Sequence, residues 1–511
     1  MELENNETYF DFKNTSTVSV GLLFVAISFV ILKVFQEIVY WYKIGRKLPP
    51  GPIGLPIVGY LPFLGKEPHK KFWNMKAKFG DIFGVYMGRK FTVILNEYNV
   101  MKEVLSHSAA LDRASEVLNY LDPGGLMIEN GEKWMEQRKF CLSAARDLGL
   151  GKRHWEDLIM TETSNFIEKL HDLKGEPSDI SHELASSLIS NIISLLIGRR
   201  LKNEESDKLQ LLMDYIKIAL VYTGPTLPTT AVPVLRKICE SLKIAGYDKA
   251  VRVITQFASF IREEIADHKT SPDFQDTNDF INSYLKKISS LSEAKNTNHY
   301  FSENMLAGNL NALFLGGSDT IFSSLIWLFR LMCKHKNIQE NVHTELMEAL
   351  GEDDTASYDE RHKIPYTFAV LMEAQRISSI VPLSTTRRAS QAIHINGYVI
   401  PKGSDICANL WGLHNDPAYW NKPEEFRPER FLTDDGAKLL KHPPSYTPFS
   451  IGRRNCPGET IAWMAILFYF SEILRKFEIC IPPGVEPEFN VINGLVSRLS
   501  PQPLCFKERQ N

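Results

Sequence analysis

Apolar residues recur at helical spacing through most of the chain after about residue 60. This spacing predicts amphipathic helices over residues 70–78, 99–107, 131–145, 154–173, 180–197, 208–222 and 248–268. Residues 83–87, 91–95 and 393–400 instead alternate between apolar and polar, which is typical of short strands. The pattern predicts a mainly α fold with a smaller β region, in the α+β class.

Three segments between these helices are predicted to be exposed connections. Residues 223–233 contain three prolines, which interrupt helical hydrogen bonding, and the segment is expected to be a loop. Residues 271–279 and 290–298 are rich in polar side chains, and they are expected to lie at the surface.

The longest helical pattern runs from residue 302 to 333, and it would span ~45 Å at ~1.5 Å per residue. Its apolar residues occupy several faces, which predicts deep burial. Gly316 and Gly317 lie in its middle, at a cost of about 2 kcal/mol relative to alanine. Either a close helix contact needs small residues there, or the helix kinks to make room for a ligand. Asp319 and Thr320 follow directly.

The N-terminal region has the pattern of a membrane anchor. No charged residue occurs from Asn14 to Leu32, and basic residues follow the apolar segment, which places the body of the chain in the cytosol. A cleaved signal peptide would need a basic start and a small-residue cleavage site, and neither is evident. We expect a lumenal tail (1–17), a transmembrane anchor (18–42), a basic and proline-rich hinge (43–60) and one large domain (61–511).

Composition and charge exclude several classes of protein. The 511 residues are 44% hydrophobic and 23% charged, which is ordinary for a globular protein. A net charge of -3 argues against general nucleic-acid binding, which needs a basic surface. The seven cysteines contain no C-x-x-C pair, so neither a disulfide framework nor a zinc ribbon is expected.

One cysteine, Cys456, has neighbours that indicate chemistry. It precedes an apolar helical pattern that runs from residue 459 to 477, so the positive end of a helix dipole would stabilise its thiolate. Arg454 adds positive charge two residues earlier. Such a thiolate can act as a nucleophile or a metal ligand, and a buried inert cysteine is the alternative.

The segment around Cys456 matches the heme-binding loop F-x-x-G-x-R-x-C-x-G of the cytochromes P450, with Phe449 as its first residue. Three further stretches match motifs of that family in its order: Gly316–Thr320, Glu373–Arg376 and Asn409–Phe431. From Pro49 onwards the chain therefore resembles the animal microsomal members of this family. The resemblance implies a single heme-enclosing cytochrome P450 fold and a monooxygenase activity.

The resemblance also implies a role for each matching residue. Cys456 is implied as the axial ligand of heme b iron. The other residues implied to contact the heme are Trp134, Arg138, Arg454, Arg387, Arg113, Phe449, Gly452 and Gly458. Glu373, Arg376 and Arg430 are implied to form a structural charge cluster. Thr320 and Asp319 are implied to deliver protons during catalysis.

The expected partners follow from the same resemblance. The chain contains neither G-x-G-x-x-G nor a P-loop, so electrons from NADPH would come from a flavoprotein reductase, with O2 as co-substrate. We expect a single-pass protein of the endoplasmic reticulum membrane with a cytosolic catalytic domain and a lipophilic substrate. Residues 48–64 and 378–386 look similar to arthropod enzymes that hydroxylate steroids. Broad oxidation of xenobiotics, or a non-catalytic heme sensor, are the alternatives.

Overall fold

The computed structural model describes residues 47–509 except 115–123, 150–152, 223, 225, 273–277, 352–354 and 493. It also describes six separate residues between 25 and 35. The expected lumenal tail lies outside the described residues, as does most of the expected anchor. Within the described part, α13 has the length and hydropathy to cross a bilayer, but 61% of its most apolar window is buried inside the protein.

Helices make up most of the described chain, and the apolar periodicity predicted most of them to within a few residues. The helices are α2 (Pro68–Phe79), α3 (Tyr98–Ser106), α5 (Gly131–Asp147), α6 (Arg153–Asp172), α7 (Ser181–Ile197), α8 (Ser206–Val221), α9 (Pro228–Ala231), α10 (Pro233–Ser241), α11 (Tyr247–Thr270), α12 (Phe280–Glu293), α13 (Glu303–Lys334), α14 (Lys336–Leu350), α15 (Pro365–Ser378), α16 (Leu410–His414) and α17 (Glu459–Lys476). Short 3-10 turns are η1 (Leu61–Phe63), η2 (Ser108–Ala110), η3 (Asn203–Glu205), η5 (Arg361–Lys363) and η6 (Pro428–Phe431).

The strands form one five-stranded sheet of order β1-β2-β7-β4-β3 and three two-stranded sheets. The strands are β1 (Ile82–Met87), β2 (Lys90–Leu95), β3 (Asp112–Arg113), β4 (Arg387–Arg388), β5 (Ile393–Ile395), β6 (Tyr398–Ile400), β7 (Asp405–Ala408), β8 (Phe477–Cys480), β9 (Val491–Ile492), β10 (Arg498–Leu499) and β11 (Cys505–Glu508). In the large sheet β2 and β7 are parallel, and the other neighbouring pairs are antiparallel. The α+β prediction is confirmed.

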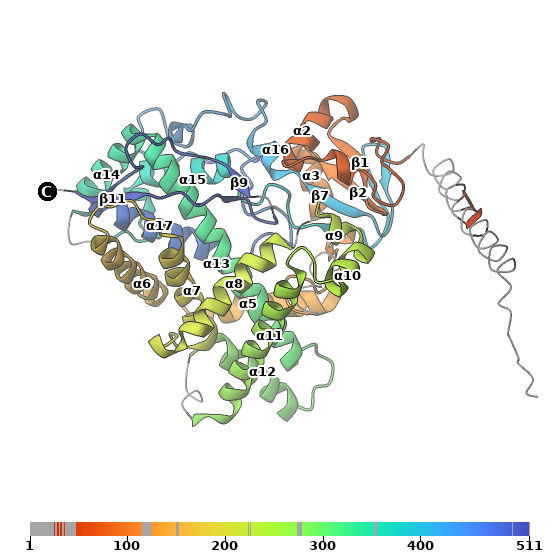
Figure 1. The fold of residues 1–511 in the computed structure, drawn as a ribbon, viewed down its shortest axis with the longest axis horizontal. Helices are drawn as coiled ribbons and strands as arrows, with labels where there is room; N and C mark the ends of the chain where they lie inside the picture. The colour runs from red at the N-terminus through yellow and green to blue at the C-terminus, as the bar shows by residue number, and fades with distance from the viewer. Residues whose placement is uncertain are drawn as a thin grey trace, which may run out of the picture.

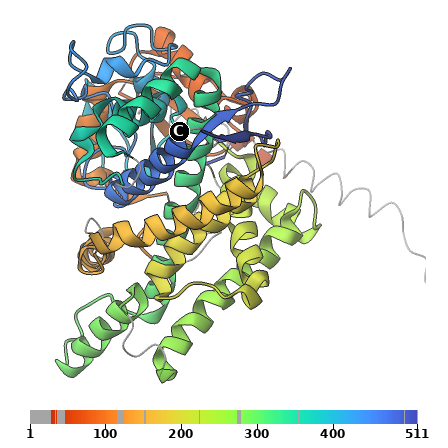
Figure 2. The ribbon, with the colours of Figure 1, turned by 90° about the vertical axis from the view of Figure 1, so that its left-hand side faces the viewer.

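The long helix α13 runs through the middle of the molecule (Figure 1). The large sheet lies at one end with α2, α3 and α16, and α6, α14 and α17 lie at the other. Figure 2 shows α11 and α12 projecting away from the body that contains the sheet. Ser302 caps α13 by accepting a hydrogen bond from the Met305 backbone N–H at 3.2 Å. The deep burial predicted for this helix is confirmed.

The prediction for two of the three connecting segments needs correction, whereas the surface position of residues 290–298 is confirmed. Residues 223–233 contain the short helix α9 and the first residue of α10. Pro228 and Pro233 each open a helix at its first turn, where a missing N–H costs nothing. Asp279 is fully buried, because its carboxylate caps α12 by accepting from the Asn282 N–H at 2.8 Å. The first part of the segment 290–298 is the last turn of α12.

The proline-rich segment after the expected anchor packs on the body instead of spacing it away. Gly84 of β1 donates a backbone hydrogen bond to the Pro50 carbonyl at 2.8 Å. A Cβ atom on Gly51 would lie 1.6 Å from the Gly84 carbonyl oxygen, so only glycine allows this approach. The segment therefore extends the edge of the large sheet.

Candidate functional site

The loop before α17 holds Cys456 at the wall of an internal cavity. The Cys456 backbone N–H donates to the Phe449 carbonyl at 2.9 Å, which closes the loop. Gly452 has a φ of +78°, and a Cβ there would lie 2.5 Å from the Leu105 carbonyl oxygen. Gly452 thus serves the turn and its packing, whereas Gly458 and Phe449 line the cavity with Cys456.

The surroundings of Cys456 differ in one respect from the sequence prediction. Burial raises the pKa of the Cys456 thiol, and the Gly458 backbone N–H and the Arg138 guanidinium oppose that rise. Arg454, the expected cation, points elsewhere, because it donates to the Leu111 carbonyl at 2.8 Å and to the Glu129 carbonyl. Arg138 takes its place, and it donates to Asn455 Oδ1 at 2.8 Å.

Four arginines line the same cavity, and we call them the cavity arginines: Arg113, Arg138, Arg387 and Arg454. The sheet register places Arg113 of β3 directly opposite Arg387 of β4, on neighbouring antiparallel strands. Arg138 comes from α5. In the described part of the chain, no carboxylate lies within ion-pair distance of any of the four, and their donors go to backbone carbonyls and asparagine side chains.

This clustering is electrostatically unfavourable for the protein alone. Burial, followed by the neighbouring arginines, lowers the pKa of Arg454 to about 8, of Arg387 to about 9 and of Arg113 to about 10. The Arg454 guanidinium lies 3.9 Å from the centre of the Trp134 ring. Trp134 is buried, and its indole N–H has no hydrogen-bond partner among the described residues. Free N–H donors and uncompensated positive charge are what a bound dianion requires.

Thr320 and Asp319 are adjacent in α13 but face different cavities. Thr320 lines the Cys456 cavity, and its hydroxyl donates to the Gly316 carbonyl at 2.7 Å. Asp319 is buried against Arg498 of β10 and lines a separate cavity of about 170 Å³. Burial raises the pKa of Asp319, and Arg498 opposes that rise. The structure therefore does not bring Asp319 to the Cys456 cavity, and Arg498 is a partner that sequence reasoning missed.

The sequence allowed two interpretations of the glycine pair in α13, a close helix contact or room for a ligand. Each interpretation fits one of the two glycines. A Cβ on Gly317 would lie 2.7 Å from Ile192 Cδ1 of α7, which is the close helix contact. A Cβ on Gly316 would meet no atom within 4 Å, because this glycine faces the cavity. The helix remains α-helical through both residues.

The rest of the cavity lining is mostly apolar and comes from the segment before α5, from α7 and α13, from the segment after α15 and from the C-terminal loop. These residues include Leu126, Ile192, Leu195, Leu313, Ile380, Val381, Leu495 and Val496. Besides the cavity arginines, the polar side chains on the lining are Thr320, Ser324, Gln375, Ser384, Thr385, Ser450 and Asn455. A mainly apolar wall with polar groups at defined positions is usual for a lipophilic ligand.

A second group of charges, which we call the paired cluster, consists of Glu373, Arg376 and Arg430. Glu373 Oε2 lies 2.7 Å from Arg376 Nε, and Glu373 Oε1 lies 3.0 Å from Arg430 Nε. Glu373 and Arg376 are fully buried. Arg376 also donates to the His414 carbonyl at 2.7 Å, which ties α15 to α16.

Comparison with known proteins places the chain in a family. The family model "Cytochrome P450" matches residues 49–506. The chain is 29% identical to Cytochrome P450 18a1 of Drosophila melanogaster, with 98% of this chain and 93% of the relative covered. It is 32% identical to Cytochrome P450 2U1 of Bos taurus, with 91% and 89% covered, and 30% identical to Cytochrome P450 2A12 of Mus musculus, with 91% and 94% covered.

The cofactor of this family, heme b, fits the cavity. The Cys456 thiol, apolar side chains, the cavity arginines and Trp134 all line this space. Among the described residues, no carboxylate lies within ion-pair distance of these arginines. A porphyrin with an iron atom and two carboxylates needs these donors. The enzyme is thus an oxidoreductase that uses O2 and NADPH-derived electrons, and the chain belongs to the cytochrome P450 family.

Proposed function

We propose that this enzyme inserts one atom of O2 into a lipophilic endogenous molecule, with a steroid as the favoured class. In the balanced reaction, substrate C–H, O2, NADPH and a proton give the alcohol, water and NADP⁺. The observation that carries the proposal is the apolar cavity with Cys456 and the cavity arginines on its wall.

We assign the heme contacts as follows. Cys456 would bind the heme iron through its thiolate, and the heme would supply the activation of O2. Trp134 and the cavity arginines hold the two heme carboxylates by charge-assisted hydrogen bonds. Phe449 covers the sulfur side, since it lines the cavity and packs edge-on against Trp463 with ring centres 5.5 Å apart. Gly458 leaves room for the ring, because a Cβ there would meet only Cys456 Sγ, at 4.0 Å.

Thr320 is proposed as the group that holds a proton inside the cavity. Its hydroxyl donates a hydrogen bond to the Gly316 carbonyl, and rotation about χ1 would turn the O–H toward the cavity. Asp319 is proposed as the acid that resupplies the proton from the opposite side of α13, where it shares a cavity with His182 and Lys217.

The test of this assignment compares Thr320→Ala with Thr320→Ser. We expect Thr320→Ala to keep NADPH oxidation but to lower the fraction that yields product by about a hundredfold, the lower end of general-acid contributions. Thr320→Ser, which keeps the hydroxyl, should retain most coupling. Product and NADPH are measured in the same reaction, and unchanged coupling in Thr320→Ala would contradict the role.

The substrate class is tested by spectral titration of the heme with a panel of steroids, fatty acids and unrelated drugs. One tight, saturable spin-state shift with a steroid supports a dedicated enzyme. Similar weak shifts with many unrelated compounds support the second candidate, broad oxidation of xenobiotics, which the mainly apolar lining also allows.

We further propose a membrane-bound flavoprotein reductase as the electron donor. Lys133 and Lys139 of α5, with Arg453, are exposed on the side of the protein that carries Cys456. The helix α5 contacts the cysteine loop through the Arg138–Asn455 hydrogen bond. This face therefore offers a short path for electrons from the reductase to Cys456. The predicted anchor at residues 18–42 would hold the enzyme in the endoplasmic reticulum membrane beside that donor.

Charge reversal tests the docking face. The double variant Lys133→Glu and Lys139→Glu should lower reductase-supported turnover by about tenfold at low salt, while turnover with added peroxide stays unchanged. The matched control is Lys286→Glu and Lys287→Glu in α12, which should leave both activities unchanged. An equal loss in the peroxide reaction would show damage to the site instead.

A further inference from the structure

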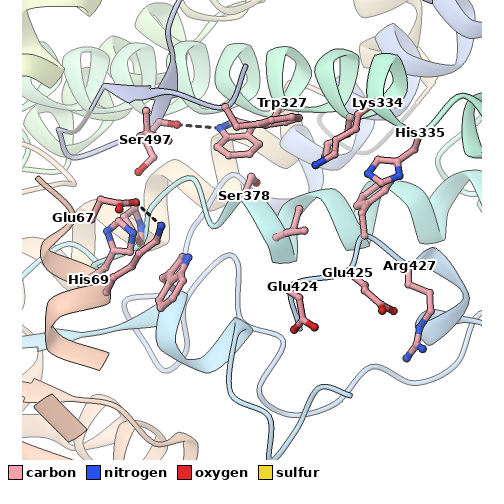
Figure 3. Close-up of a pocket in the computed structure, with 18 residues that line it drawn as sticks. Glu67, His69, Trp327, Lys334, His335, Ser378, Glu424, Glu425, Arg427 and Ser497 are labelled. Carbon is pink, nitrogen blue, oxygen red and sulfur yellow. Dashed lines mark hydrogen bonds and ion pairs between the residues drawn. The ribbon is translucent and has the colours of Figure 1, made fainter. Parts of the chain in front are cut away.

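A second cleft of about 610 Å³ lies outside the Cys456 cavity and shares no lining residue with it. Its walls come from the C-terminal part of α13, the end of α15, α16, the start of α2 and residues 424–427, together with Phe489, Val491 and Ser497 (Figure 3). This volume lies within the range of small-molecule sites in proteins. No step of the proposed monooxygenase reaction uses it.

Aromatic rings form much of its wall. Trp327 of α13 packs against Phe489 with ring centres 5.5 Å apart, and its indole N–H donates to the Ser497 carbonyl at 3.3 Å. Trp411 of α16 packs against His69 with ring centres 5.2 Å apart. Both tryptophans are half-buried and line the cleft, and Lys70 Nζ lies 5.8 Å from the centre of the Trp411 ring. Their exposed ring surface is available to a flat ligand.

Three polar side chains at the cleft have unused hydrogen-bonding groups. His69, Ser378 and Ser497 line it and are only 5%, 6% and 4% exposed. Their imidazole and hydroxyl groups have no hydrogen-bond partner among the described residues. Their polar atoms are not sealed from solvent, so a molecule in the cleft can reach them, and the three residues come from three separate segments that meet there. Burial lowers the pKa of His69 to about 4, so its ring is neutral at physiological pH.

The charges at the cleft compensate one another. Three acidic residues line it, Glu67, Glu424 and Glu425, and three basic ones, Lys70, Lys334 and Arg427. Two of the acids already have partners, since Glu67 pairs with Lys70 at 2.6 Å and Glu425 pairs with Lys422 at 2.9 Å. The cleft therefore has no net charge that would attract a charged ligand.

We propose that this cleft binds a flat, uncharged, largely apolar molecule that carries a hydroxyl or carbonyl group. The faces of Trp327 and Trp411 hold its apolar body, and the free groups of Ser378, Ser497 and His69 bind its polar group. The site is separate from the heme cavity, so both can be filled at once.

The test uses the full-length heme-loaded protein with 4-phenylimidazole saturating the heme cavity. Calorimetric titration with 2-naphthol should then show one saturable site, and naphthalene, which lacks the hydroxyl, should bind about fivefold more weakly, the worth of one neutral hydrogen bond. Ser378→Ala should weaken 2-naphthol about fivefold and leave naphthalene unchanged. Trp411→Ala should weaken both by about tenfold.

The control is Ser290→Ala, which removes an exposed hydroxyl of α12 and should change neither ligand. Each variant is first checked for a normal reduced carbon monoxide spectrum. If Ser378→Ala does not fold, the proposal is tested by the binding of both ligands to Trp411→Ala. The absence of saturable 2-naphthol binding with the heme cavity filled would overturn the proposal. Wild-type affinity in the variants would overturn it equally.

Discussion

Two groups of buried arginines differ in the source of their compensating charge. In the paired cluster, Arg376 and Arg430 meet the carboxylate of Glu373 within 3.0 Å. Among the cavity arginines, Arg387 is as deeply buried as Arg376, with 2% exposure or less for both, yet no carboxylate lies within reach in the described part of the chain.

The difference separates a structural group from a binding group. A buried charge is tolerated when a partner and hydrogen bonds compensate its desolvation, as they do in the paired cluster. Burial, and after it the repulsion between neighbouring arginines, lowers the pKa values of Arg387 and Arg454. In the described part of the chain their hydrogen bonds go to backbone carbonyls and asparagine side chains. We propose that the carboxylates of heme compensate their charge.

The strongest test of the comparison removes one member of the paired cluster. Arg376→Ala leaves Glu373 buried with only Arg430 beside it, and the loss should be about 3–5 kcal/mol. We expect no folded holoprotein, measured as heme incorporation per polypeptide. The exposed control Arg252→Ala breaks only the surface pair with Asp248, and it should cost less than about 1 kcal/mol. Normal heme content in Arg376→Ala would contradict a structural role.

The second test removes one cavity arginine. Arg387→Met takes away a buried charge that the apoprotein does not compensate, so apoprotein stability toward urea should stay the same or rise. Heme affinity should fall by about 2 kcal/mol, or roughly thirtyfold, through the loss of a charge-assisted hydrogen bond. Transfer of heme to an acceptor protein measures this fall. If apoprotein stability drops as it does in Arg376→Ala, the two groups are equivalent and the comparison fails.

A third test, with a smaller expected effect, measures how the stability of the protein depends on pH through His414, which lies beside the paired cluster. Burial, then Arg376, lowers the pKa of His414 to about 3, while its unfolded value is 6.5. Between these values the unfolded chain binds the extra proton, so acidification destabilises the fold by about 1.4 kcal/mol per pH unit for this group. His414→Asn should remove that part of the pH dependence of urea unfolding between pH 6.5 and 4. An unchanged slope would show that His414 is protonated in the fold.

Local pattern was sufficient for most helices and for the cysteine loop. The periodicity that marks α7 or α17 is a property of neighbouring residues, and burial of the apolar stripe then follows. The loop around Cys456 could be identified because its glycines, arginine and cysteine are adjacent in the chain. Pro228 and Pro233 misled the prediction, since a proline begins a helix as well as it breaks one, and only the neighbouring packing distinguishes the two.

By itself, then, the sequence determined the helical body, the heme-thiolate motif and the identity of the charged residues around it. The tertiary structure alone decided which way each of them points. Successive residues of an α-helix differ by about 100° in direction, so Thr320 enters the Cys456 cavity while Asp319 turns to Arg498. Desolvation and ion pairing depend on segments far apart in the chain. Only the fold therefore shows that, among the described residues, no carboxylate lies within ion-pair distance of the cavity arginines, and only the fold reveals the second cleft.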